Sequence, residues 1–324
     1  MSSTHRQPLV SVVMIFWNAA AAGPASRPTA FMDEAIRSVL DQELKPIELL
    51  LCDDGSDDAS TALARAWADR LPHRVRYLEH PNHVHAGMSA TRNLGLAAAE
   101  GRALAFLDAD DVWLPEHLAR YWGSLEQHPE AAAVCGRALD WHSWDDAGRA
   151  DVWSELPWPS GTVVDPPAML LAVLRRGAYS TPVCSLLVRR EVAQELGGSE
   201  AAFTGMYEDQ VLLSKLYLTR TIVLEDAPTA LYRQHAGSST AQAIRQGLYH
   251  PGSENPSREV FLRWLVKQQS TGAEPDPQVA AALQASLRPY DRSSARLRWR
   301  SLALARALRQ RARQALNHRV GRTP

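Results

Sequence analysis

Cysteine is scarce in this chain, which has three among its 324 residues, at Cys52, Cys135 and Cys184. Their spacing matches neither a disulfide framework nor a metal-binding motif. Each lies among apolar residues, which is typical of a free, buried thiol. The sequence therefore excludes a small fold that is held together by disulfides.

Long apolar runs and net charge are lacking as well. No run of about eighteen apolar residues exists, so we expect no segment that spans a bilayer. The polar segment 1–8 leads straight into a short apolar run, which argues against a signal peptide. The formal net charge of −1 argues against bulk binding to nucleic acid. A chain of this length with 45% hydrophobic residues can bury one large core and a small appendage, as a cytoplasmic globular protein does.

The most informative segment is Ala105–Trp113, in which an apolar run ends in three carboxylates, Asp108, Asp110 and Asp111. This pattern is typical of a buried central strand where it emerges at the edge of a sheet. Carboxylates at such an edge suit Mg²⁺ or Mn²⁺, which proteins commonly hold together with the phosphates of a substrate. The alternative is an acidic turn that caps a helix starting near Pro115.

Two further apolar segments have the same design. Ile47–Cys52 runs into the acidic turn 53–58, and Leu9–Trp17 ends at Asn18. Strands that alternate with helices form a parallel, doubly wound sheet, which binds ligands outside the carboxyl ends of its strands. The three polar strand ends are therefore expected to share one edge. Helical apolar spacing between the strands covers Phe31–Leu40 and Ser60–Leu71.

Four blocks of residues, taken together, resemble a known family. The blocks are Val10–Asn18, Glu48–Asp58, Gly87–Gly95 with Ala105–Asp111, and Glu208-Asp209 with Tyr232–Ser238. In this order and spacing they resemble the family 2 glycosyltransferases, over about residues 8–240. The resemblance implies an α/β fold of the GT-A type, a doubly wound, mostly parallel sheet flanked by helices, over residues 1–245. Residues 246–324 are expected to form a helical C-terminal extension with a basic amphipathic tail.

The resemblance implies that the acidic cluster holds a divalent cation, Mg²⁺ or Mn²⁺, against the two phosphates of a sugar nucleotide. Asp110 corresponds to the direct metal ligand, and Asp108 to a residue that contacts the ribose or the water shell of the metal. Asp111 either belongs to this site or caps a helix predicted over Trp113–Trp122. His235 corresponds to a residue that completes the metal shell or binds the diphosphate.

The same resemblance implies a nucleotide-sugar site. Asp54 corresponds to a residue that accepts a hydrogen bond from the imide N–H of uracil, which favours UDP or dTDP over a purine nucleotide. Trp17 offers an aromatic face on which the base can stack. Arg92 corresponds to a residue that reaches the base or the diphosphate; the alternative is a salt bridge on a helix surface. The residues predicted to bind the nucleotide sugar are Ile15, Trp17, Asn18, Asp54, Arg92, Asp108 and Ala109.

Transfer with inversion also needs a general base, which takes the proton from the acceptor hydroxyl on the side of the sugar opposite the metal. By the resemblance, Asp209 is this base and Glu208 orients the donor or the acceptor, so both are predicted catalytic residues. They precede a helical pattern over Val211–Leu218. The alternative is therefore that Asp209 only caps this helix.

Some segments depart from the family pattern. Residues 15–18, Ile-Phe-Trp-Asn, replace the usual Pro-Thr-Tyr-Asn, and Ala19–Ala30 resembles an insertion, so an altered donor preference is expected. Gly237–Gln246 is predicted to be a lid over the donor. Tryptophans in the stretch 140–167 either bind the sugar acceptor or pin a long loop to the core. They are Trp141, Trp144, Trp153 and Trp158.

The end of the chain has its own character. Beyond Leu287 the sequence is rich in arginine and leucine, carries one tryptophan, Trp299, and has Asp291 as its only acid. A basic amphipathic helix of this kind can lie on anionic lipid, which would bring the protein to a lipid-linked acceptor at the inner face of the membrane. The alternative is a terminal helix that packs on the core.

The sequence thus predicts an inverting glycosyltransferase that moves a sugar from a nucleoside diphosphate sugar, first of all a UDP-sugar, to a hydroxyl of a carbohydrate or lipid-linked glycan. Such an enzyme would act in bacterial-type assembly of polysaccharides or glycoconjugates. One alternative is a sugar nucleotidyltransferase, for which residues 18–30 lack the expected Gly-rich, basic loop. The other is a catalytically silent protein that binds nucleotide sugars or glycans, which has no chemical need for all of these acids.

Overall fold

The computed structural model describes residues 7–21, 30–145, 148–153, 155–176, 181–250, 254–270 and 276–291. Contacts within the chain define one unit that ends at Gly247 and a second unit that starts at Leu248. This division falls two residues beyond the boundary expected from the sequence.

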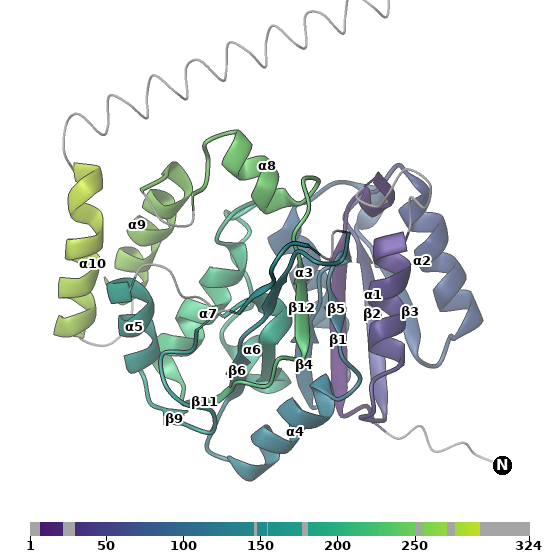
Figure 1. The fold of residues 1–324 in the computed structure, drawn as a ribbon, viewed down its shortest axis with the longest axis horizontal. Helices are drawn as coiled ribbons and strands as arrows, with labels where there is room; N and C mark the ends of the chain where they lie inside the picture. Colours follow the sequence, from purple (N-terminus) through teal and green to yellow (C-terminus); the bar gives the residue numbers. More distant parts are fainter. Residues whose placement is uncertain are drawn as a thin grey trace, which may run out of the picture. The chain divides into compact units, whose positions relative to one another are not determined.

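The first unit contains a mixed sheet, which has eight strands within the described residues, in the order β3-β2-β1-β4-β10-β6-β11-β9 (Figure 1). The strands β3, β2, β1 and β4 run parallel, and β10 lies antiparallel between β4 and β6. β11 is parallel to β6, and β9 pairs antiparallel with β11. The predicted fold class, a mostly parallel sheet flanked by helices, is confirmed. The bounds are β1 Val10–Phe16, β2 Ile47–Asp53, β3 Val75–Glu79, β4 Ala103–Phe106, β6 Ala133–Gly136, β9 Val163–Val164, β10 Leu186–Arg189 and β11 Ile222–Glu225.

The neighbouring strands β1 and β2 are buried at every residue. Side chains point alternately to the two faces of a strand, so helices must cover both faces, and the strands are apolar almost throughout. On one face, Met14 belongs to a buried cluster with Ile36 of α1 and Trp67 of α2. On the other face, Gly95 of α3 lies against Val13. These helices, α1 Ala30–Leu40, α2 Ala59–Arg70 and α3 Met88–Ala98, include both helices predicted from the sequence.

A second, smaller sheet has four strands in the described part of the chain, in the order β5-β12-β7-β8. The helix predicted over Trp113–Trp122 is wrong at its start, because Trp113 belongs to β5 and pairs with Ala230 of β12. This tertiary pairing outweighs the local helical pattern, and α4 begins only at His117. The bounds are β5 Val112–Trp113, β7 Leu139–Trp141, β8 Val152–Trp153, β12 Ala230–Arg233 and α4 His117–Gln127.

The remaining helices include the segment predicted as a lid, most of which forms α8. The hydroxyl of Ser238 caps this helix by accepting a hydrogen bond from the Ala241 N–H at 3.1 Å. The predicted helical C-terminal region is present as α9 and α10, whereas the basic tail at 292–324 and residues 22–29 of the insertion lie outside the described residues. The bounds are α5 Ala168–Arg176, α6 Arg190–Glu195, α7 Glu208–Thr219, α8 Ser239–Arg245, α9 Pro256–Ser270 and α10 Pro277–Asp291, with short 3₁₀ turns η1 Ala19–Ala21, η2 Pro81–His83 and η3 Val183–Ser185.

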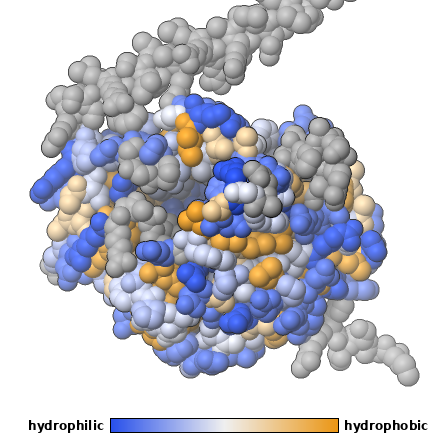
Figure 2. Space-filling view, viewed as in Figure 1, coloured by the Kyte–Doolittle hydropathy of each residue, from blue (hydrophilic) through white to orange (hydrophobic). Residues whose placement is uncertain are grey.

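The burial of the cysteines and the distribution of apolar residues agree with the composition of the chain. The three cysteines are free and buried, as predicted. On the face shown in Figure 2, hydrophobic residues form patches that are separated by hydrophilic ones. Among the described residues, no helix combines the length and the apolar character that crossing a membrane requires.

The close approach of α3 to the sheet gives a prediction for Gly95. A Cβ atom at this position would lie against Val13 Cγ1 and 3.0 Å from Cys52 Sγ, so Gly95→Ala should lower the free energy of unfolding by about 1–3 kcal/mol. Gly123 in α4 is the matched control, because a Cβ atom there would meet no described atom within 4 Å apart from its chain neighbours and its own helix backbone, and Gly123→Ala should raise stability by up to about 1 kcal/mol. Urea unfolding followed by circular dichroism measures both; equal effects would contradict the packing of α3.

Candidate functional site

Most residues predicted for the nucleotide-sugar site follow three adjacent strands, in the order β2-β1-β4, whereas Ile15 lies within β1 and Arg92 in α3. Because these strands are parallel, their carboxyl ends share one edge of the sheet, where α/β sheets bind ligands. Asp54, Trp17 and Asp108 follow β2, β1 and β4, and neighbouring strands are about 5 Å apart. The predicted common edge is therefore confirmed, and an elongated ligand can lie along it.

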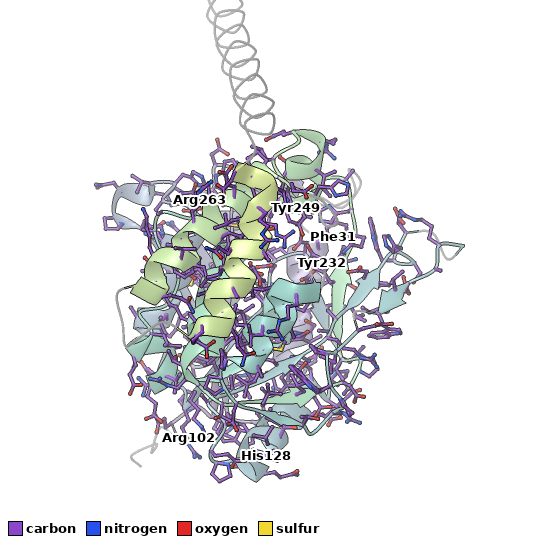
Figure 3. The ribbon with its side chains drawn as sticks, turned by 90° about the vertical axis from the view of Figure 1, so that its left-hand side faces the viewer. Phe31, Arg102, His128, Tyr232, Tyr249 and Arg263 are labelled. Carbon is purple, nitrogen blue, oxygen red and sulfur yellow. The ribbon has the colours of Figure 1, made fainter. Side chains whose placement is uncertain are left out.

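The predicted metal ligands, Asp110 and His235, are in contact: Asp110 Oδ2 lies 2.8 Å from His235 Nε2. The His235 side chain is 6% exposed and its ring packs edge-on against Phe31. Phe31 lies at the end of the first unit opposite Arg102, the residue before β4 (Figure 3). His235 Nδ1 is buried and has no hydrogen-bond partner within the described part of the chain.

The side chains at this place suit a divalent cation. A carboxylate and an imidazole nitrogen fit Mg²⁺ or Mn²⁺. No hydrogen bond from Nδ1 of His235 to another described residue holds this ring in place. Within the described residues, no group of three or more His, Cys, Asp or Glu side chains is placed to hold a metal by itself. A divalent cation that a protein holds through one or two side chains takes its other ligands from phosphate and water.

Arg233, which is not among the predicted site residues, supports the loop that carries Asp110. Its backbone N–H donates to Asp111 Oδ1 at 2.9 Å, and its Nε donates to the Asp110 carbonyl at 2.7 Å. One terminal nitrogen of its guanidinium donates to Glu34 Oε2 at 2.7 Å. The arginine side chain is 2% exposed. Ring centroids lie 4.2–5.3 Å from its guanidinium carbon, and these rings belong to Phe31, Trp141 and Trp144.

The contacts of Arg233 bear on the two roles predicted for the tryptophans, which are to bind the sugar acceptor or to pin a long loop to the core. Trp141 and Trp144 pack against buried Arg233, and the Trp144 indole donates to the Gln234 carbonyl at 2.9 Å. Both therefore pin their loop to the core. Trp153 is 38% exposed and stacks with Arg137, so an acceptor-binding role stays a prediction for that residue.

Asp111 does not cap a helix. It is 1% exposed, its Oδ1 accepts the Arg233 N–H, and the N-cap position of α4 is Glu116. Burial, followed by the neighbouring charges of Asp110 and Asp108, raises the pKa of Asp111 well above its ordinary value. Asp111 therefore fixes the turn after β4 to β12 from inside the protein.

Arg92 connects the two acidic parts of the site. One terminal nitrogen of its guanidinium donates to Asp108 Oδ1 at 3.1 Å, and the other makes a short contact with Glu208 Oε2. The Arg92 side chain is 4% exposed, so the alternative of a salt bridge on a helix surface is wrong. A buried guanidinium thus joins α3, the end of β4 and the start of α7, and any contact with a nucleotide is an addition to these ion pairs.

Asp209 lies next to this pair, in the first turn of α7. The N-cap residue is Tyr207, with a φ of 70°, so the alternative that Asp209 caps the helix is wrong. The Asp209 carboxylate accepts from the backbone N–H of Gln210 at 2.8 Å and from its side-chain amide at 3.1 Å. The carboxylate is half-buried, and burial is the main cause that raises its pKa.

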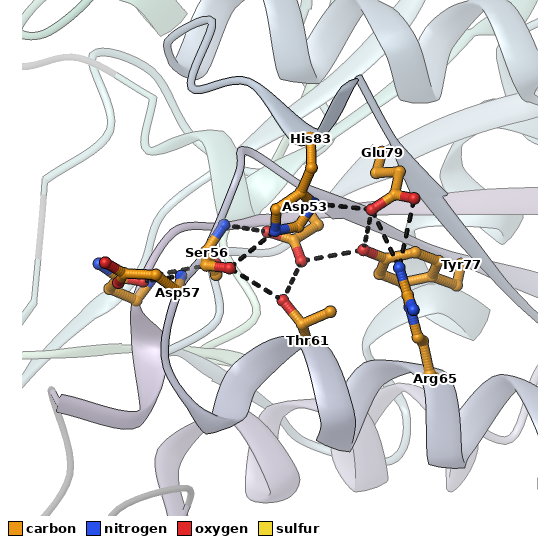
Figure 4. A network of polar contacts seen from close by, with 9 residues as sticks. Asp53, Ser56, Asp57, Thr61, Arg65, Tyr77, Glu79 and His83 are labelled. Carbon is orange, nitrogen blue, oxygen red and sulfur yellow. Dashed lines mark hydrogen bonds and ion pairs between the residues drawn. The ribbon is translucent and has the colours of Figure 1, made fainter. Parts of the chain in front are cut away.

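The loops at the other end of the edge are tied to one another. The Asn18 backbone N–H donates to the Ser56 hydroxyl at 3.0 Å, and the Asn18 side-chain oxygen accepts from the Asp57 N–H at 2.9 Å. Behind this loop, buried Asp53 accepts hydrogen bonds from the Ser56 N–H at 2.8 Å and from the Tyr77 hydroxyl at 3.0 Å (Figure 4). The network fixes the loop after β2 against β3 and α2.

Three predicted binding residues have little free surface. Ile15 is 7% exposed, Ala109 8% and Asp54 3%. The Asp54 carboxylate accepts from the backbone N–H groups of Ala86 at 2.7 Å and of Gly87 at 3.0 Å. Side-chain contacts of these three residues with a ligand stay predictions.

Two residues of this edge were not among the predicted site residues. Arg233 stands two positions before His235, and His85 stands two positions before Gly87. In the sequence, Arg233 lies within the matched block Tyr232–Ser238, and His85 lies just before the block Gly87–Gly95. A basic residue in such a place can equally belong to the surface, so the sequence alone could not select them.

Comparisons with known proteins agree with this architecture. The model of the family "Glycosyl transferase family 2" matches residues 11–194. An uncharacterized glycosyltransferase of Nostoc sp., alr2836, is 39% identical over 90 residues, which are 28% of this chain and 27% of that protein. The uncharacterized glycosyltransferase EpsJ of Bacillus subtilis is 33% identical over 129 residues, which are 40% of this chain and 34% of EpsJ. The chain thus matches about a quarter to a third of the length of these relatives.

Solved structures share the fold at low sequence identity. A structure of S. aureus TarS 1-349 in complex with UDP-GlcNAc superposes with a TM-score of 0.63 and 14% identity, over 86% of this chain and 71% of that one. The mannosyltransferase PcManGT of Pyrobaculum calidifontis, in complex with GDP-Man and Mn²⁺, gives a TM-score of 0.55 and 16% identity, over 94% and 81%. Because the family model covers more than half of its 324 residues, this chain belongs to glycosyl transferase family 2, and it has the GT-A fold.

Proposed function

We propose that this enzyme transfers a sugar, with inversion, from a nucleoside diphosphate sugar to a hydroxyl of a carbohydrate or lipid-linked glycan. The contact of Asp110 with His235 carries the proposal, because it brings a carboxylate and an imidazole to the sheet edge that also holds the Arg92-linked acids. A UDP-sugar is the donor favoured by the sequence resemblance. The names of two relatives, a putative teichuronic acid biosynthesis glycosyltransferase and a minor teichoic acid biosynthesis protein, both of Bacillus subtilis, support a place in the assembly of bacterial polysaccharides.

The donor would lie along the edge of the sheet. Its base would meet Trp17, Asn18 and Asp54 at the ends of β1 and β2, and its diphosphate would reach Asp108 and Asp110 after β4. The UDP-GlcNAc in TarS and the GDP-Man with Mn²⁺ in PcManGT support a sugar nucleotide and a divalent cation here. Asp110 and His235 would hold Mg²⁺ or Mn²⁺, which, when bound, neutralises the charge that develops on the leaving diphosphate.

Asp209 would act as the general base that accepts the proton of the attacking hydroxyl. It lies on α7 next to Glu208, and Arg92 links Glu208 to Asp108 on the donor side. Arg92 therefore fixes the start of α7 relative to the end of β4. A base held in this way is positioned before the acceptor arrives, which lowers the entropic cost of the reaction.

The contacts of the two neighbouring acids favour Asp209 over Glu208 as the base, because Glu208 is bound to the buried Arg92 guanidinium, whereas Asp209 accepts from Gln210. Burial raises the pKa of Glu208 to about 7, although the Arg92 guanidinium opposes this shift. A neighbouring acid with this pKa is partly protonated near neutral pH. Its average negative charge is then smaller, which reduces its repulsion of an ionised Asp209. Glu208 would then orient the donor or the acceptor through Arg92.

The composition near the end of the sequence supports the acceptor and the location that we propose. The arginine-rich segment beyond Leu287 would attach a cytoplasmic enzyme to anionic lipid at the inner face of the membrane, where lipid-linked glycans are available. This part of the proposal rests on sequence composition alone.

The first test concerns the metal. Asp110→Asn keeps the size of the side chain and removes its charge, so metal-dependent binding of UDP should weaken by at least about 100-fold. Isothermal titration with UDP and Mn²⁺ measures the loss, and Glu130→Gln, an exposed change at the pair with His128, serves as the control. Unchanged binding in Asp110→Asn, or full activity in excess chelator, would remove the metal from the proposal.

The second test concerns the base. Asp209→Asn should lower kcat by roughly 10²–10⁴-fold, because general-base catalysis contributes about this much, while the affinity for UDP and metal stays near wild type. Turnover is measured beside nucleotide titration, with exposed Asp226→Asn as the matched control. Retained turnover would move the role of base to Glu208, and lost nucleotide binding in a folded variant would place Asp209 in the donor site.

The third test uses the raised pKa of Glu208. In the unfolded chain a glutamate loses its proton near pH 4.5, whereas folded Glu208 keeps it up to about pH 7. Between these values the folded state binds more protons, so rising pH lowers the free energy of unfolding, by up to about 3 kcal/mol for this group.

Glu208→Gln removes the titrating group, so its stability should fall less between pH 5 and pH 8 than that of the wild type. Denaturant unfolding at several pH values measures the two slopes, and exposed Glu191→Gln should retain the wild-type slope. Identical slopes for Glu208→Gln and the wild type would show that the pKa of Glu208 is that of an ordinary glutamate.

A further inference from the structure

A pair of exposed rings stands at the end of the site where the base would bind. Trp17 follows β1 and His85 lies between η2 and α3, and their ring centroids are 4.6 Å apart with an angle of 32° between the planes. The Trp17 residue is 55% exposed and the His85 side chain 52%. Large aromatic side chains are commonly buried, so an exposed pair at a ligand-binding edge offers a surface for a planar group.

The buried carboxylate of Asp54 has its hydrogen-bonding capacity taken up inside the protein. Its Oδ1 accepts from the backbone N–H groups of Ala86 and Gly87, and its Oδ2 lies 3.1 Å from the Gly87 nitrogen and 3.0 Å from His85 Nδ1. Three donors make these contacts, because the Gly87 N–H is shared between the two oxygens, and together they engage both oxygens of the carboxylate. The location, at the start of α3, is one where a negative charge stabilises a helix.

The same contacts fix which nitrogen of His85 carries the proton. Nδ1 faces two acceptors, the Asp54 carboxylate and the Asp54 carbonyl at 3.1 Å, so Nδ1 is the donor. In a neutral imidazole the other nitrogen, Nε2, is then a hydrogen-bond acceptor. No partner of Nε2 is found in the part of the chain that the structure describes.

We infer that His85, oriented by Asp54 and stacked against Trp17, is the residue that recognises the base of the donor, by accepting a hydrogen bond from an imide N–H. This inference rests on the proposed nucleotide-sugar function and deepens it. Uracil, thymine and guanine carry such an N–H on the ring. Cytosine and adenine present an unprotonated ring nitrogen at the corresponding position, so two acceptors would face each other.

The inference gives the site a defined class of donor, sugar diphosphates of uridine, thymidine or guanosine. A site built to pair with an N–H rejects an analogue that lacks it, because the pairing group is left without a partner. Asp54 acts through His85 as a positioning residue. Trp17 contributes stacking, which every base can use and which therefore adds affinity without selecting among bases.

The experiment compares nucleotides that differ only in the base, at pH 8, where imidazole side chains are ordinarily neutral. Isothermal titration of the full chain with UDP, GDP, CDP and ADP, each with Mn²⁺, should give at least about tenfold tighter binding for UDP or GDP than for CDP and ADP. His85→Phe keeps a ring beside Trp17 and removes the acceptor, so this preference should fall to less than about threefold. His85→Gln can place an oxygen near the position of Nε2 and should restore part of the preference.

Controls separate the base contact from a loss of structure. Binding of inorganic pyrophosphate with Mn²⁺ needs no base, so His85→Phe should leave it unchanged. His128→Phe, at the opposite end of the first unit from Phe31 (Figure 3), should keep the full preference among nucleotides. A preference retained in His85→Phe overturns this inference alone and returns base recognition to Asp54. Equal binding of all four nucleotides by the wild type overturns it too, whereas no binding of any of them overturns the proposed function as well.

Discussion

The arrangement of this site depends on a buried guanidinium. Arg92 lies between Asp108, at the end of β4, and Glu208, at the start of α7, and it is the cation that both carboxylates contact. Burying charged groups costs several kcal/mol each, which good geometry and mutual attraction must offset. Removal of the cation would leave Glu208 without its counter-charge inside the protein. The ion pairs therefore link the donor side of the site to the helix that carries Asp209, so that neither part can shift alone.

The sequence predicts the part of this fold in which local pattern and tertiary position agree. Segments such as Ile47–Cys52, which is apolar apart from Glu48, form parallel strands buried on both faces, and the acids that follow them lie at the edge proposed to bind the donor. It cannot predict that β10 runs antiparallel between β4 and β6, because this pairing joins segments that are distant in sequence. The short strand at Trp113 is missed for the same reason.

For each site residue, the kind of interaction that its side chain can make was easier to predict than the residue that it contacts. Asp110 and His235 do meet, as the resemblance implies. Asp111, by contrast, has the same side chain as its neighbours but points inward and holds β12. Trp144 packs against Arg233, although a tryptophan can equally bind a sugar. In each case the residue type permits two roles, and only the three-dimensional arrangement decides between them.

The two ends of the edge are built differently, which bears on how such an enzyme can change its donor. The loop with Asp110 is backed by Arg233, three aromatic rings and buried Asp111, so a substitution there disturbs the core. At the base end, the rings of Trp17 and His85 are exposed, and the preceding residues of the second loop, Asn82 and His83, have positive φ values of 59° and 54°. Exposed loop residues can be exchanged at little cost in packing. The end proposed to hold the phosphates is therefore constrained by the fold, whereas the end proposed to hold the base lies where the structure tolerates change.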